Sequence, residues 1–180
     1  MFHAVSVFLF MWLLLIFSSF IALIAIVFSI HLLVPMLLGA PFVRTRKGGR
    51  KAMFELARIK TGELVVDLGS GDGQLLIEAA QKGAKCIGYE INPWLVYVSR
   101  SRVKKLGLQD KIKIIKKSLW RADVSQADVI LLFGIVHIMP RLEKKLQAEL
   151  RSGARVVSFT FSFPHWVAKN SRENVKLYLK

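Results

Sequence analysis

The chain has 180 residues, with 27 Lys or Arg, 12 Asp or Glu and a single cysteine, Cys86. This length supports one catalytic domain with its own core but excludes two ordinary domains beside a membrane segment, and the lone cysteine excludes an intrachain disulfide or a cysteine-based metal cluster. Every Lys, Arg, Asp and Glu follows Val43, so the net charge of +15 falls on residues 44–180 and favours anionic partners such as phospholipid, nucleic acid or an acidic protein.

Residues 4–30 carry no charged side chain and are dominated by Leu, Ile, Val, Phe and Ala. About 20 helical residues cross a bilayer, so this stretch predicts one transmembrane helix, with a cleaved signal peptide as the alternative. Five basic residues follow the span: Arg44, Arg46, Lys47, Arg50 and Lys51. The positive-inside rule then predicts a cytoplasmic C-terminal domain at a bacterial inner membrane, or alternatively at a mitochondrial inner membrane.

Residues 31–49 are expected to form an interfacial segment, because they are apolar at first but interrupted by Pro35, Gly39 and Pro41.

Residues 50–180 alternate between helical and strand patterns. Helices are expected at 50–60, 74–82, 92–106 and from residue 140 to about 150. Strands are expected at 64–67, 85–90, 112–116, 129–133 and 154–161, followed by two short strands in the tail. This alternation predicts a doubly wound, Rossmann-like α/β domain with a parallel sheet.

The segment from Asp67 to Gly73 reads Asp-Leu-Gly-Ser-Gly-Asp-Gly and joins a predicted strand to a helix. Such a glycine-rich turn lets a nucleotide cofactor lie against the backbone, although a dinucleotide fingerprint would have glycine in place of Gln74. The acids Asp67 and Asp72 would repel a pyrophosphate but suit a cationic ligand. The loop therefore favours S-adenosylmethionine over a nicotinamide dinucleotide, and Glu90 at the end of the second strand is placed to bind a ribose in either class.

The chain resembles the class I, seven-stranded methyltransferases, whose first motif matches residues 67–73. Further segments resemble one group within that class, the membrane-anchored protein-lysine methyltransferases that modify the ATP synthase c subunit and the adenine nucleotide translocase. These segments are Gly39-Ala40-Pro41-Phe42, Glu90-Ile91-Asn92-Pro93-Trp94, Phe133-Gly134, the run 139–146 and Phe161-Ser162-Phe163-Pro164-His165-Trp166. The resemblance covers about residues 39–180 and implies five parallel strands closed by a β-hairpin.

Residue by residue, the resemblance implies a cofactor-binding set. It consists of Asp67, Gly69, Ser70, Gly71, Asp72, Gly73, Glu90, Ile91, Ser118 and Leu119. Ser118 stands where the family often has an acid for the adenine amino group, so Leu119, Trp120 and the backbone are expected to contact adenine instead.

A lysine nucleophile must lose its proton, and an apolar channel beside a cationic sulfonium favours the neutral amine, so no dedicated base is required. Phe163, Pro164 and Trp166 are the predicted substrate channel, and Phe161 is a further candidate for which core packing is the simpler explanation. His137 is a candidate general base, and an ordinary surface histidine is the alternative interpretation. The four histidines lack ligand spacing, so no metal is expected.

These observations predict a membrane-anchored methyltransferase, with a protein lysine in a membrane protein as its expected target. A lipid or quinone methyltransferase and an RNA-binding module with a vestigial cofactor loop are the alternatives, although a nucleic-acid partner is not favoured. A basic run lies around the third strand, at Lys104, Lys105, Lys111, Lys113, Lys116 and Lys117. It is interpreted either as a solvated face or as a surface that attracts a membrane or substrate.

Overall fold

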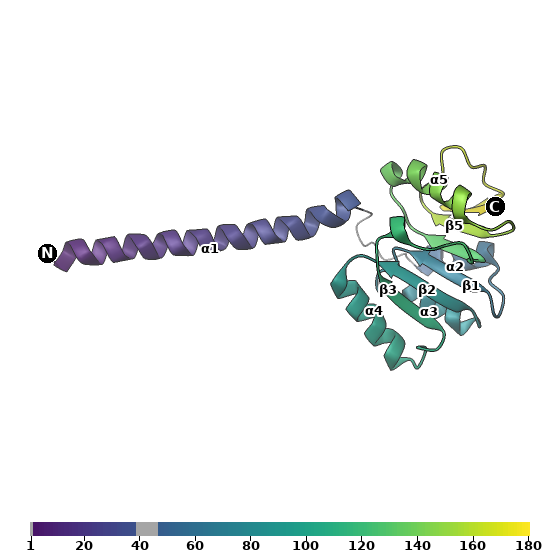
Figure 1. The fold of residues 1–180 in the computed structure, drawn as a ribbon, viewed down its shortest axis with the longest axis horizontal. Coiled ribbons are helices and arrows are strands. Elements are labelled where there is room, and N and C mark those ends of the chain that lie inside the picture. Colours follow the sequence, from purple (N-terminus) through teal and green to yellow (C-terminus); the bar gives the residue numbers. More distant parts are fainter. Residues whose placement is uncertain (1, 39–46) are drawn as a thin grey trace. The chain divides into compact units, whose positions relative to one another are not determined.

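The computed structural model describes the backbone of residues 2–38 and 47–180, and the side chains of residues 10–30 and 47–180. The chain divides into two compact units, Met1–Leu37 and Leu38–Lys180. The first unit is a helix and the second is an α/β domain (Figure 1).

Helix α1 spans Phe2–Leu38 and contains one stretch, Phe10–Ile30, that is long and apolar enough to cross a membrane, with a mean hydropathy of 2.9. The few polar side chains of this stretch are satisfied within the helix. Ser18 and Ser19 donate to the carbonyl oxygen of Leu15, and Ser29 donates to that of Ala25. The stretch Phe10–Ile30 therefore presents an almost wholly apolar surface.

The predicted interruption at Pro35 is wrong. Proline removes one backbone donor from a helix, yet α1 continues past Pro35 to Leu38. Residues 39–46 of the predicted interfacial segment, including Gly39-Ala40-Pro41-Phe42, lie outside the described residues, and residues 47–49 form the start of helix α2.

The domain is built on a seven-stranded sheet in the order β3-β2-β1-β4-β5-β7-β6 (Figure 1). Five strands are parallel: β1 (Leu64–Leu68), β2 (Lys85–Glu90), β3 (Ile112–Lys116), β4 (Val129–Leu132) and β5 (Arg155–Phe159). All five end at the same side of the sheet, which we call the carboxyl edge; the opposite side is the amino edge. The predicted doubly wound fold is confirmed.

The tail forms the hairpin of β6 (Asn170–Arg172) and β7 (Val175–Leu179), as the resemblance implied. Strand β7 pairs antiparallel with β5, from Arg155 opposite Leu179 to Phe159 opposite Val175. Strand β5 ends two residues earlier than predicted, because Thr160 adopts a left-handed backbone with φ of 71°.

Two apolar cores lie on the two faces of the sheet. Helices α2 (Lys47–Ala57), α3 (Gln74–Gln81) and α4 (Pro93–Lys105) cover one face with side chains such as Met53, Leu76 and Val103. Helix α5 (Met139–Glu149) covers the other face through Leu142 and Leu146, together with the short 3₁₀ helices η1 (Leu119–Arg121) and η2 (Val136–Ile138). Each crossover leaves the carboxyl edge and returns the chain to the amino edge, where the next parallel strand begins. Parallel α/β sheets place their ligands at the carboxyl edge.

Candidate active site

The turn after β1 is a glycine loop held against β2. Gly69, Gly71 and Gly73 have φ of 106°, 53° and 78°, a left-handed region in which residues with a Cβ are strained. The backbone N–H groups of Gly69 and Ser70 both donate to the carbonyl oxygen of Tyr89, at 2.9 and 3.0 Å. The loop therefore depends on glycine for its shape and on β2 for its position.

A fourth glycine, Gly88 in β2, lets the loop approach the strand. A Cβ at Gly88 would lie 2.7 Å from Ser70 Oγ and 2.5 Å from Leu76 Cδ1. The sequence interpretation missed Gly88, although a glycine inside a strand is a known sign of close backbone approach. Ser70 Oγ is buried and has no hydrogen-bond partner among the described residues, so the loop holds an unsatisfied polar atom.

Glu90 ends β2 and joins the glycine loop to the start of α4. Its Oε2 accepts from the N–H of Gly71 at 2.9 Å, and its Oε1 accepts from the N–H groups of Ile91 and Asn92, each at 2.8 Å. Asn92 in turn caps α4 by accepting from Trp94 N–H at 2.9 Å. These bonds fix the Glu90 carboxylate at the carboxyl edge, where parallel α/β sheets place their ligands.

Asp67 lies at the same edge, in β1, and is almost fully buried. Burial raises the pKa of its carboxyl to about 8, and the nearby carboxylates of Glu90 and Asp72 act in the same direction. An acidic group that is desolvated and crowded by other acids is stabilised in its charged form by a cation. The site therefore has the chemistry to bind a positively charged ligand.

Asp72 forms an ion pair within the protein, whereas the sequence suggested that its carboxylate faces a cationic ligand. Its Oδ2 pairs with Arg102 of α4 at 2.8 Å, and the same guanidinium donates to the Asp72 carbonyl oxygen and to Gln74 Oε1. Arg102 thus clamps the loop to α4 and offsets the charge of Asp72. Of the two acids that we expected to favour a cationic ligand, Asp67 forms no ion pair with a basic side chain in the part of the chain that the structure describes.

Ser118 and Leu119 follow β3 beside Glu90. The Lys117 N–H donates to the Glu90 carbonyl oxygen at 3.0 Å, and the Ser118 hydroxyl oxygen accepts from Trp120 N–H at the start of η1. Leu119 is half-buried against the second core, and the Arg141 guanidinium lies 4.3 Å from the centroid of the Trp120 ring. The segment predicted to contact adenine is therefore at the carboxyl edge next to Glu90.

Aromatic rings follow the neighbouring strands at this edge. Phe133, after β4, lies edge-on to Phe159 with centroids 5.1 Å apart and stacks on Phe161 at 6.2 Å. Phe133 and Phe161 are both half-buried, whereas His137 in η2 is exposed. The sequence interpretation considered Phe161 but missed Phe133 as a site residue, which only the parallel register of β4 and β5 brings beside it.

Two of the three residues of the predicted substrate channel, Phe163 and Trp166, pack against the second core. Phe163 is buried against Tyr178 and Trp166, and its N–H donates to the Tyr178 hydroxyl. Trp166 Nε1 donates to the carbonyl oxygen of Leu179, whose strand partner is Arg155 at the amino edge. Pro164 is exposed. No helix joins β5 to β6, so these aromatic side chains cover the second core themselves, and we interpret Phe163 and Trp166 as packing residues.

The assembled groups fit S-adenosylmethionine. Asp67 offers a carboxylate to a cationic ligand, Glu90 holds a second carboxylate that can accept from ribose hydroxyls, and a Cβ at Gly69 would meet nothing within 4 Å, so the turn is open there. The unsatisfied Ser70 Oγ adds a polar atom to the loop. We found no group of three or more potential metal ligands among the described residues.

Comparison with known proteins agrees with this geometry. Residues 67–170 match the family model of the ANTKMT methyltransferase domain. The chain is 42% identical to the lysine N-methyltransferase of the ATP synthase c subunit from Xenopus laevis, over 71% of this chain and 56% of that protein. It is 32% identical to a protein-lysine N-methyltransferase of Saccharolobus islandicus, over 76% of this chain and 84% of that protein.

Among solved structures, the chain is similar to an RNA methyltransferase from Salinibacter ruber in complex with S-adenosyl-L-homocysteine. It is 34% identical, with a TM-score of 0.71, over 76% of this chain and 91% of that chain. The present chain spans little more than half the length of its Xenopus relative. By family model, sequence identity and fold, the chain belongs to the ANTKMT methyltransferase-domain family of S-adenosylmethionine-dependent enzymes.

Proposed function

We propose that this protein transfers a methyl group from S-adenosylmethionine to a lysine side chain of a membrane protein. The observation that carries the proposal is the pair of buried acids, Asp67 and Glu90, at the ends of two adjacent parallel strands around the glycine loop. The names of the Xenopus and Saccharolobus relatives support lysine as the target.

The residues of this chain divide the work as follows. Asp67 stabilises positive charge, while Glu90, together with Ile91, Ser118 and Leu119, holds the nucleoside part of the cofactor, which supplies an activated methyl group when bound. Gly69, Ser70, Gly71 and Gly73 let the ligand lie against backbone, and Asp72 fixes the loop through Arg102.

The lysine amine must reach this site without its proton. Neutralising a lysine with an ordinary pKa of about 10.4 at pH 7 costs roughly 4 to 5 kcal/mol. The half-buried rings of Phe133 and Phe161 exclude water beside the site and disfavour the ammonium form. This arrangement needs no general base, and the exposed His137 is not required.

We further propose that residues 4–30 anchor the enzyme in a membrane and that the domain of residues 50–180 lies on the cytoplasmic side. The apolar stretch Phe10–Ile30 matches the thickness of a bilayer, and basic residues follow it in the sequence. Anchoring confines enzyme and membrane-protein substrate to the same surface and raises their effective concentration.

RNA methylation is a second candidate. The likeness to the Salinibacter ruber RNA methyltransferase and the net charge of +15 favour it. The aromatic rings of Phe133 and Phe161 offer faces against which either a lysine amine or a nucleobase can pack.

One experiment separates the candidates. The purified full chain is incubated with S-adenosylmethionine carrying a labelled methyl group and with membranes and RNA from a strain that lacks the enzyme. We expect the label on a lysine of an integral membrane protein, identified by mass spectrometry, and expect none with the Glu90→Ala variant. Label in RNA or in the lipid extract, and not in protein, would overturn the lysine assignment.

A further inference from the structure

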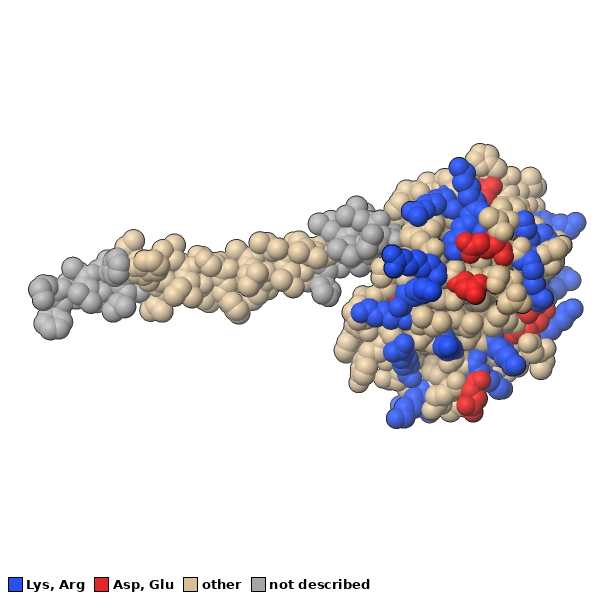
Figure 2. Space-filling view, viewed as in Figure 1, with Lys and Arg blue, Asp and Glu red and all other residues tan. Residues whose placement is uncertain are grey.

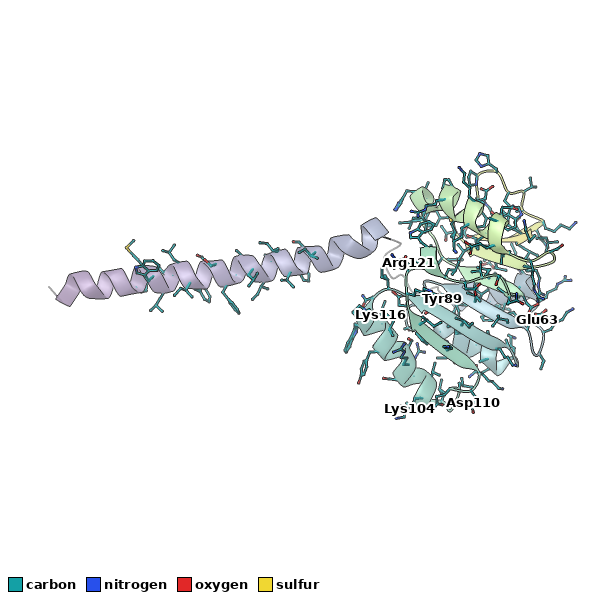
Figure 3. All side chains as sticks on the ribbon, in the orientation of Figure 1. Glu63, Tyr89, Lys104, Asp110, Lys116 and Arg121 are labelled. Atoms are coloured by element: carbon teal, nitrogen blue, oxygen red, sulfur yellow. The ribbon has the colours of Figure 1, made fainter. Side chains whose placement is uncertain are left out.

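The predicted basic run does not form one patch. Helix α4 and strand β3 run in opposite directions, so the run is divided between the two edges of the sheet. Lys104, Lys105 and Lys111 lie where α4 ends and β3 begins, whereas Lys116 and Lys117 lie where β3 ends. Figure 3 shows this separation: Lys116, Arg121 and Tyr89 lie toward one edge of the sheet, and Lys104, Asp110 and Glu63 lie toward the other.

The carboxyl edge differs from the amino edge by two exposed aromatic side chains. Trp94 and Tyr97, in the first turns of α4, are 67% and 63% exposed, and their rings stack with centroids 5.7 Å apart. Val136 of η2 is 71% exposed at the same edge. Trp and Tyr combine an apolar ring with a polar group, which is why they are enriched in the headgroup layer of membranes.

Basic side chains accompany these rings. Lys116, Lys117 and Arg121 are exposed, and none of them forms an ion pair with a carboxylate among the described residues. The nearby acid Asp123 accepts hydrogen bonds from the N–H and hydroxyl of Ser125, and the charge of Lys117 is among the weaker causes that lower its pKa. Three basic side chains against this one acid leave the edge with net positive charge, which complements anionic phospholipid.

The length of the chain keeps this edge within reach of a bilayer. Eight residues, 39–46, separate Leu38 from Lys47, and a fully extended backbone of that length spans at most about 30 Å. A helix that crosses the membrane with Phe10–Ile30 would therefore hold the domain close to the membrane surface.

We propose that the carboxyl edge docks on an anionic phospholipid bilayer, with Trp94 and Tyr97 in the headgroup layer and Lys116, Lys117 and Arg121 against lipid phosphates. This inference rests on the proposed membrane anchor. It deepens the proposed function, because the edge that binds the cofactor then faces the membrane. Substrate lysines near the bilayer surface reach the site directly, whereas lysines on distant domains do not.

The single cysteine makes a direct test practical. Cys86 is buried, and burial raises the pKa of its thiol to about 12, so a cysteine introduced on the surface is labelled selectively. The full-length Tyr97→Cys variant, carrying an environment-sensitive dye, is reconstituted into nanodiscs of neutral phosphatidylcholine with or without phosphatidylglycerol. Asp110→Cys, exposed at the amino edge, is the matched control.

We expect the dye at position 97 to report an apolar environment in anionic nanodiscs and an aqueous one at high salt, while the dye at position 110 remains aqueous throughout. Neutralising three basic residues at the docking edge (Lys116→Gln, Lys117→Gln, Arg121→Gln) should weaken docking by about fivefold for each charge removed. The triple variant Lys104→Gln, Lys105→Gln, Lys111→Gln removes the same charge from the other edge and should leave docking intact.

Equal exposure of positions 97 and 110 in anionic nanodiscs would overturn the docking surface. If methylation of a membrane protein persists in that case, the proposed function stands without it. Equal effects of the two triple variants would show that net charge alone drives association and would also overturn the proposal, as would a response of the dye to added RNA but not to anionic lipid. Failure of the full chain to insert into nanodiscs would contradict the proposed membrane anchor and, with it, this inference.

Discussion

Asp67 and Glu90, at the ends of β1 and β2, form a buried acidic site that favours a positively charged ligand. Glu90 is stabilised by three backbone N–H groups, whereas Asp67 is desolvated and lies near two other acids. Ionising Asp67 therefore lowers the stability of the folded state, and a bound cationic ligand would offset this loss.

This imbalance predicts a pH-dependent stability. The pKa of Asp67 is about 8 when folded, against an ordinary value of 3.8, so between these values the folded protein binds more protons than the unfolded one. Raising the pH through this window therefore lowers the free energy of unfolding. Without ligand, the melting temperature should fall from pH 5 to pH 8, and Asp67→Asn should flatten this decline.

The control for that measurement is Asp110→Asn, because Asp110 is exposed. Its melting curve should keep the pH dependence of the wild-type protein. A wild-type slope that survives Asp67→Asn would show that other groups cause it.

At the scale of the elements, α4 both supports β3 and fixes the glycine loop. Arg100 donates to the carbonyl oxygen of Ile114 in β3, while Arg102, two residues later, holds Asp72 and Gln74. Arg100 therefore stabilises the contact between α4 and β3, whereas Arg102 positions the glycine loop.

Replacing each arginine by methionine separates these roles. Arg102→Met removes the ion pair that holds Asp72 and the glycine loop to α4. We expect S-adenosylmethionine to bind about fivefold to 150-fold more weakly in calorimetry, which corresponds to a loss of about 1–3 kcal/mol. Arg100→Met should lower stability by a similar amount but retain cofactor affinity. Equal affinities of the two variants would mean that Arg102 does not position the loop.

The contact between α2 and β5 depends on a glycine. A Cβ at Gly49 would lie 2.4 Å from the Phe159 ring, whereas one at Gly48 would meet nothing within 4 Å. Gly49→Ala should therefore destabilise the protein by about 1–3 kcal/mol through overpacking. Gly48→Ala should leave its stability unchanged or raise it by up to about 1 kcal/mol, since alanine is a better helix former. Denaturant unfolding of both variants tests this; similar midpoints would contradict the close packing of Gly49 on Phe159.

The same elements show what periodicity predicts well. Strands 85–90 and 112–116 were predicted at their observed bounds, because the glycines Gly83 and Gly107 end the helical patterns that precede them. Helix α2 begins three residues before its predicted start, because Gly48 and Gly49 read as breakers, although the second glycine is what permits packing on β5.

The site was predictable only in part, for a related reason. The loop, Asp67 and Glu90 follow one another along two strands, so sequence order places them together. Phe133 and Phe161 meet only through the pairing of β4 with β5, and Trp166 is turned toward the amino edge by Leu179. Contacts of that kind depend on tertiary register, which local patterns do not specify.

At the scale of the whole molecule, charge and apolarity are segregated along the sequence. Phe10–Ile30 is apolar, while the domain surface is rich in Lys and Arg, with fewer Asp and Glu side chains among them (Figure 2). This segregation suits the proposed anchoring at an anionic membrane, in which the apolar helix would provide attachment and the basic surface would provide orientation.

The central claim is that Asp67 and Glu90 bind the cationic cofactor, and titration calorimetry tests it most directly. S-adenosylmethionine is titrated into the full chain at pH 7 in two buffers with different ionisation enthalpies. We expect binding with release of up to about one proton, because the ligand displaces the proton that Asp67 holds at this pH. The release should disappear in Asp67→Asn, and binding should be lost in Glu90→Ala. Absence of binding to the wild-type chain, or the same proton release from wild type and Asp67→Asn, would contradict the account.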